Sequence, residues 1–120
     1  MSKIKIESKL IGDETSFFSG YGILRKNEIL FNENEIKTKI KIFEDKIFIE
    51  RNNQYLLKIE FIRGKKTKAT YNMYGNNYYF DILTKKLNIK DNNIYIEYDL
   101  IISDNQKMNF SYNIDYSIDS

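Results

Sequence analysis

The sequence predicts an all-β domain that folds as a single closed or nearly closed antiparallel up-and-down β-barrel of about eight to ten strands. Three observations support this class. Apolar and polar residues alternate with a period of two along most of the chain, short polar turns separate the alternating segments, and no Pro interrupts them. A meander with this many strands exposes two hydrogen-bonding edges, and closure into a barrel removes both of them.

The length and composition are those of one globular domain. The chain has 120 residues, of which 42% are hydrophobic and 30% charged, with ten Tyr and eight Phe. This apolar content is sufficient to offset the entropy lost on folding, which argues against intrinsic disorder. Residues 1–120 are therefore expected to form one barrel domain.

The alternation is clearest in three segments. Residues 36–42 alternate Ile or Thr with Lys, residues 94–100 place Ile, Ile, Tyr and Leu on one face, and residues 108–118 alternate apolar residues with Asn, Ser and Asp. On a helix these spacings would scatter the apolar groups around the axis, whereas on a strand they form one face. No segment requires a long helix.

Turns rich in Asn, Asp and Gly separate the strands, because these residues tolerate the positive φ of tight hairpins. Gly20 and Gly22 predict a bulge or a sharp bend in the second strand. The expected strands, some of which should merge to leave nine or ten, comprise residues 3–11, 15–24, 28–32, 36–43, 46–51, 55–62, 67–74, 77–84, 86–90, 93–102 and 107–117.

Composition also excludes several kinds of chemistry. The net charge is only +2, which argues against nucleic acid as the main partner, and the chain has no Cys and therefore no disulfide or thiolate. No spacing motif indicates a metal or another cofactor. No segment approaches the roughly 20 apolar residues of a membrane helix, and the first residues lack an export signal, so a cytoplasmic location is expected. The oligomeric state stays open.

Four stretches together resemble the YwiB-like family of small uncharacterised bacterial proteins. They are residues 36–42, residues 46–51, residues 71–75 leading to 84–87, and residues 94–100 with the alternating strand that follows. The resemblance covers most of the chain and implies a lipocalin-like (calycin) β-barrel. By analogy with that fold, it suggests small-molecule binding and no established activity.

Enzymatic chemistry has few of its usual groups here. His and Cys are both absent, which removes the commonest general base and the thiol nucleophile, so the chain is expected not to be an enzyme. Glu97 and Asp99 share one strand face, roughly 7 Å apart along the strand, which is a separation found in glycosidases. Because they alternate with Ile96 and Tyr98, the favoured interpretation is a solvated outer face, and a carboxylate hydrolase is a third, weaker alternative.

The leading hypothesis is a barrel that binds a small, partly apolar or amphipathic ligand in its interior. Arg51 continues the apolar face of its strand and is a candidate contact for an anionic group. Tyr71, Tyr98 and Tyr112 lie on apolar faces and are candidate pocket walls. Arg63 also follows an apolar face, but at the far end of a hairpin from Arg51, so the two Arg are not expected to form one clamp.

The alternative is a module with a filled core that binds protein or RNA through its Lys-rich outer strands. Its candidate contacts are Lys37, Lys39, Lys41 and Lys66. Interior volume separates the two hypotheses, since a cavity above about 300 Å³ favours a ligand and a filled core favours a surface partner.

Overall fold

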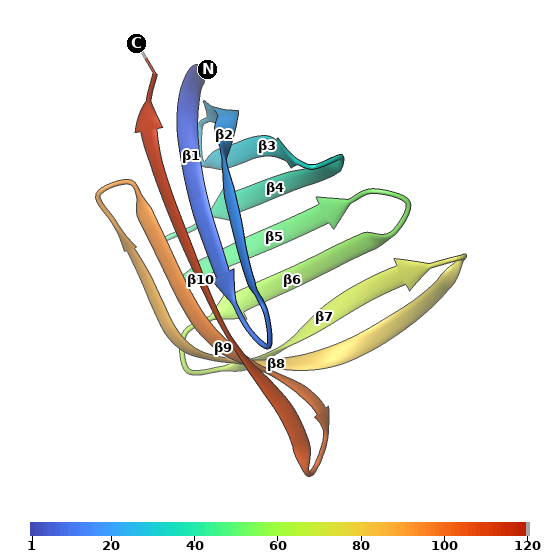
Figure 1. Cartoon of the computed structure of the whole chain (residues 1–120). Coiled ribbons are helices and arrows are strands. Elements are labelled where there is room, and N and C mark those ends of the chain that lie inside the picture. The colour runs from blue at the N-terminus through green and yellow to red at the C-terminus, as the bar shows by residue number, and fades with distance from the viewer. Residues whose placement is uncertain (120) are drawn as a thin grey trace.

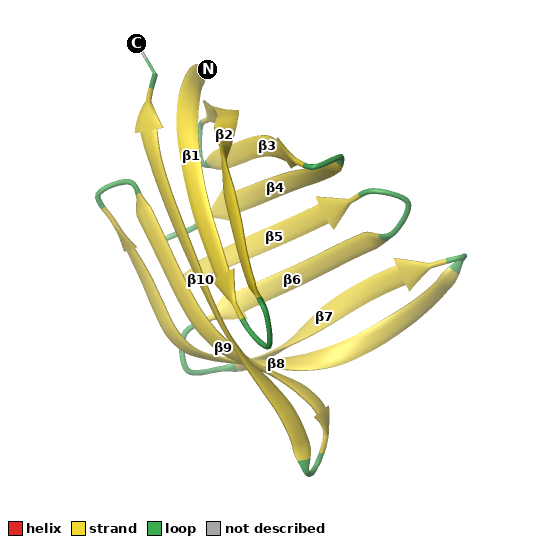
Figure 2. Ribbon diagram, viewed as in Figure 1, coloured by secondary structure: helices red, strands yellow, loops and turns green. Residues whose placement is uncertain are grey.

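The computed structural model describes residues 1–119 as one barrel of antiparallel strands (Figures 1 and 2). Each strand pairs with its neighbours in the chain, and β1 pairs with β10 to close the sheet, which confirms the predicted up-and-down barrel. Within these residues no helix is present that is long and apolar enough to cross a membrane. The strands are β1 (Ser2–Ile11), β2 (Thr15–Arg25), β3 (Glu28–Glu33), β4 (Ile36–Ile42), β5 (Lys46–Asn52), β6 (Leu56–Ile62), β7 (Lys66–Met73), β8 (Asn76–Lys90), β9 (Asn93–Ser103) and β10 (Gln106–Ile118).

The two strands expected at residues 77–84 and 86–90 are one continuous strand, β8. A shift in the β8–β9 register between Thr84 and Lys86 marks a β-bulge at the point where the sequence pattern changes phase. A bulge inserts one extra residue without ending the strand, so the alternation resumes with inward and outward positions exchanged. The change of phase in the sequence therefore reflects a bulge and not a turn.

Of the bulge or sharp bend predicted at Gly20 and Gly22, the bulge is wrong, because β1 and β2 pair without interruption across both residues. The structure gives a different reason for Gly22. A Cβ atom there would lie 2.6 Å from Cδ1 of Ile6 and 2.6 Å from the carbonyl oxygen of Leu30. Gly22 thus permits β2 to pass close to both neighbouring strands at the point where its pairing with β3 begins.

The buried core is concentrated toward one end of the barrel. Ile4 and Ile6 at the start of β1, Ile47 at the start of β5 and Ile94 at the start of β9 are each fully buried. Ile114, near the end of the antiparallel β10, joins them and pairs directly with Ile94. This end holds the two chain termini and is filled with aliphatic side chains. We call the opposite end, which carries the β1–β2, β3–β4 and β5–β6 turns, the mouth (Figure 1).

Candidate functional site

Toward the mouth, the inward-facing positions change from aliphatic to polar. On β5 the inward series runs from Ile47 through Ile49 to Arg51, and on β9 it runs from Ile94 through Ile96 to Tyr98. Strands alternate their faces, so these residues point into the same interior. The barrel therefore has an aliphatic end and a polar mouth.

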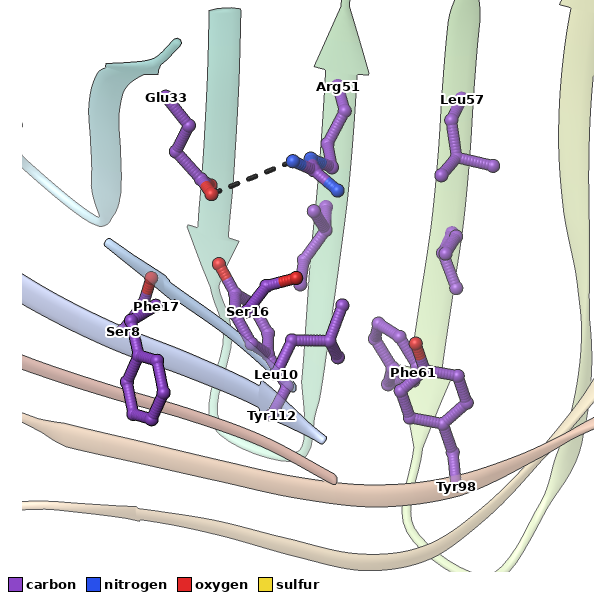
Figure 3. Close-up of a pocket in the computed structure, with 12 residues that line it drawn as sticks. Ser8, Leu10, Ser16, Phe17, Glu33, Arg51, Leu57, Phe61, Tyr98 and Tyr112 are labelled. Carbon is purple, nitrogen blue, oxygen red and sulfur yellow. Dashed lines mark ion pairs between the residues drawn. The ribbon is translucent and has the colours of Figure 1, made fainter. Parts of the chain in front are cut away.

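A pocket of about 120 Å³ occupies this polar part of the interior (Figure 3). Its apolar walls come mainly from β5 and β6, and its polar groups come from strands on both sides of the barrel. The lining residues are Ser8, Leu10, Ser16, Phe17, Glu33, Ile49, Arg51, Leu57, Ile59, Phe61, Tyr98 and Tyr112. Three of the four predicted ligand residues, Arg51, Tyr98 and Tyr112, thus line one pocket.

Arg51 forms an ion pair with Glu33 at the upper side of the pocket (Figure 3). Nη2 of Arg51 lies 3.6 Å from Oε2 of Glu33, and the hydroxyl of Thr38, on the strand between them, donates to Oε1 of Glu33 at 3.3 Å. Within residues 1–119, the buried Nε of Arg51 has no hydrogen-bond partner. A buried donor without an acceptor costs about 1–3 kcal/mol, and the guanidinium group that carries this donor lines the pocket.

Two phenols rise from the opposite side of the barrel toward this ion pair (Figure 3). Burial raises the pKa of Tyr98 to about 12, while the nearby Arg51 acts in the opposite direction. Burial likewise raises the pKa of Tyr112, and the Glu33 carboxylate raises it further, against the lowering effects of Arg51 and Ser8. Both phenols therefore stay protonated near neutral pH and are hydrogen-bond donors.

Tyr71, the fourth predicted ligand residue, is outside this pocket. It lies in a neighbouring depression of about 230 Å³ on the rim, together with Tyr55, whose ring centroid is 5.9 Å from that of Tyr71. Arg51 and Leu57 line both the inner pocket and the rim depression. Tyr71 is thus a neighbour of the site through these shared residues.

Sequence reasoning missed Glu33 and Ser8 as pocket residues. The same alternation that selected Arg51 would have found both, since Glu33 continues the inward series of Ile29 and Phe31, and Ser8 follows Ile6. This kind of pocket is therefore predicted by polar residues that continue the apolar face at the same end of several strands.

Arg63 lies at the opposite end of the barrel from Arg51, as expected for two ends of one hairpin. Its guanidinium donates from Nε to the carbonyl oxygen of Leu87 at 3.0 Å, and Nη2 donates to the same oxygen. Arg63 therefore ties the β6–β7 turn to β8 and has no place in the pocket.

The predicted Lys surface is divided by acidic neighbours. Nζ of Lys39 lies 4.0 Å from Oε2 of Glu50, and Nζ of Lys41 lies 3.9 Å from Oε1 of Glu28. Lys37 and Lys66 are exposed. The outer strands thus carry a pattern of alternating charge instead of a continuous basic stripe.

The solvated-face interpretation is wrong for Asp99, whose side chain is only 2% exposed. Oδ2 of Asp99 lies 3.2 Å from Nζ of Lys85, and the Asn109 amide donates to Oδ1 at 3.1 Å. Lys85 lies at the β8 bulge, which places its side chain over β9. Asp99 is thus held by a structural ion pair, and residues 1–119 contain no cluster of acidic side chains suited to a metal ion.

Comparisons with known proteins agree with the barrel and assign no activity. A family model described as "Domain of unknown function (DUF1934)" matches residues 4–114. A crystal structure of the ywiB protein from Bacillus subtilis matches with a TM-score of 0.65 and 16% identity, covering 98% of this chain and 91% of that one. No functionally curated protein matches. The predicted resemblance to YwiB-like proteins is confirmed at the level of family and fold.

Proposed function

Because this chain belongs to the DUF1934 family, whose function is unknown, we propose from the mouth pocket that it is a non-enzymatic barrel that binds a small, partly apolar ligand. The observation that carries this proposal is a cavity with apolar walls that the Arg51–Glu33 ion pair also lines. Ligand sites combine apolar walls with a few convergent polar groups in this way.

The pocket volume limits the size of the ligand. At about 120 Å³ it lies between a filled core and the cavity of about 300 Å³ expected for a larger molecule. An engineered apolar cavity of about 150 Å³ accommodates benzene, so this pocket matches a group of about one ring. Any larger ligand would extend past Arg51 onto the rim beside Tyr71.

The surface alternative has less support than the pocket. Of its four candidate contacts, Lys39 and Lys41 each face a carboxylate at 4.0 Å or less. The non-enzymatic part of the proposal follows from the absence of His and Cys in the whole sequence. A cytoplasmic location also belongs to this proposal.

Native mass spectrometry of the purified chain, with solvent extraction of any copurified compound, tests the proposal. We expect a stoichiometric added mass that is lost on denaturation. The variant Ile59→Phe, which fills part of the pocket, should lose that mass, whereas Ile62→Phe on the same strand but outside the pocket should retain it. A mass retained by Ile59→Phe, or no added mass from either native or recombinant cells, would contradict interior binding.

A further inference from the structure

The pocket has a charge balance that restricts its ligand. Arg51 and Glu33 are the charged side chains among its lining residues, and they face each other at 3.6 Å. The lining therefore has no net charge. An anion next to Arg51 would also lie beside the Glu33 carboxylate, and a cation would lie beside the guanidinium, so either would meet repulsion as well as attraction. A charged ligand would in addition lose its hydration in a mostly apolar pocket.

The hydrogen-bonding groups of the ion pair are complementary to a neutral polar group. The Arg51 guanidinium lines the pocket and can donate to an acceptor there, and Tyr98 is a protonated phenol that can also donate. The Glu33 carboxylate accepts one hydrogen bond from Thr38 and retains further lone pairs for a donor. A donor and an acceptor thus lie side by side in the pocket.

From this arrangement, and resting on the proposed function, we propose that the pocket binds a neutral amide attached to a ring-sized apolar group. The amide carbonyl accepts from the Arg51 guanidinium, and the amide N–H donates to Glu33. The ring occupies the space beside Phe61 and Ile59, in agreement with the cavity of about 120 Å³. An ester can accept from Arg51 but cannot donate to Glu33, and a hydrocarbon can do neither. A carboxylate ligand would be repelled by the Glu33 carboxylate.

Three isosteric probes of different charge test this ligand class: benzamide, benzoate and benzamidinium. Ligand-detected NMR titration of the full chain measures the dissociation constant of each, with toluene as an apolar reference. Benzoate cannot donate to Glu33, and benzamidinium cannot accept from Arg51, so each charged probe loses one charge-assisted hydrogen bond. We therefore expect benzamide to bind about tenfold or more tightly than either charged probe.

Changing the charge of the ion pair should change the preference. In Glu33→Gln the guanidinium of Arg51 is unopposed, so benzoate should become the preferred probe, and in Arg51→Met benzamidinium should. The control Glu35→Gln removes a carboxylate from the adjacent turn, outside the inner pocket, and should leave benzamide preferred.

Failure of this inference is distinguishable from failure of the proposed function. If toluene and all three probes bind with similar affinity, or if benzoate is preferred by the wild type, the pocket binds ligands but the neutral-amide class is wrong. If no probe, including toluene, binds, both the ligand class and interior binding are overturned.

Discussion

Removing the Tyr98 hydroxyl should make the barrel less sensitive to alkaline pH. The pKa of Tyr98 is raised to about 12, from an ordinary value of 10.0, because its phenol is buried in the pocket wall. The unfolded chain therefore loses this proton at a lower pH than the folded chain does. The stability that the neutral phenol contributes is complete below about pH 10 and is lost as the pH rises toward about 12.

The size of the effect follows from the two pKa values. At about pH 11 the phenol is mostly ionised in the unfolded chain and mostly neutral in the folded one, which corresponds to a loss of about 1.4 kcal/mol relative to neutral pH. Tyr98→Phe retains the ring that stacks on Phe110 with centroids 5.3 Å apart. The variant should therefore lose about 1.4 kcal/mol less than the wild type between about pH 8 and about pH 11.

Urea unfolding at these two pH values measures the difference. Tyr95→Phe removes a phenol from the outward face of the same strand, and it should follow the wild type. Equal alkaline losses in the wild type and in Tyr98→Phe would refute the reasoning, because they would mean that water reaches the Tyr98 hydroxyl. The pocket would then be open to solvent and lack the apolar character on which the ligand proposals depend.

Two further substitutions test the fold around the site. Gly22→Ala should destabilise the barrel by about 1–3 kcal/mol in urea unfolding, because the new Cβ would lie 2.6 Å from the Leu30 carbonyl oxygen; unchanged stability would show that β2 and β3 can separate freely. For Asp99, desolvation raises the pKa, but the Asn109 amide and Lys85 outweigh it and hold the pKa below the ordinary value, so the stability it contributes is present above about pH 4 and lost in acid. Asp99→Asn should therefore be less stable than the wild type at about pH 7 and show a smaller further loss at about pH 3, and parallel losses would contradict this role.

Alternation predicts which side of each strand faces inward, because every strand of a closed barrel has one inner face. Ile94, Ile96 and Tyr98 were placed on the inner face from the sequence alone, and all three lie there. The same pattern placed Arg51 beside Ile47 and Ile49, and Arg51 lines the pocket. The closed antiparallel barrel was predicted on the same basis.

Alternation places Glu33 and Arg51 on inner faces, but it does not predict that the two side chains meet. Glu33 and Arg51 are 18 positions apart in sequence and lie on strands separated by β4, so only the registers of two hairpins bring them together. An acidic residue at a strand end is ordinarily solvated, so its residue type argues against Glu33 as a pocket residue even though alternation places it on the inner face. The ion pair between Lys85 and Asp99 also does not follow from alternation, because the β-bulge at Lys85 interrupts the local pattern.

The energetic cost of the mouth supports a functional role for it. At the other end of the barrel, Ile4, Ile47 and Ile114 are fully buried. If stability alone had shaped the chain, apolar residues at positions 33 and 51 would continue this packing, because an ion pair whose side chains are 32% and 16% exposed contributes little stability. The chain instead keeps an ion pair, an unpartnered Arg51 donor and a cavity in one place. The proposed ligand with a neutral polar group would fill the cavity and give both members of the ion pair a hydrogen-bond partner, which a structural role for the ion pair does not.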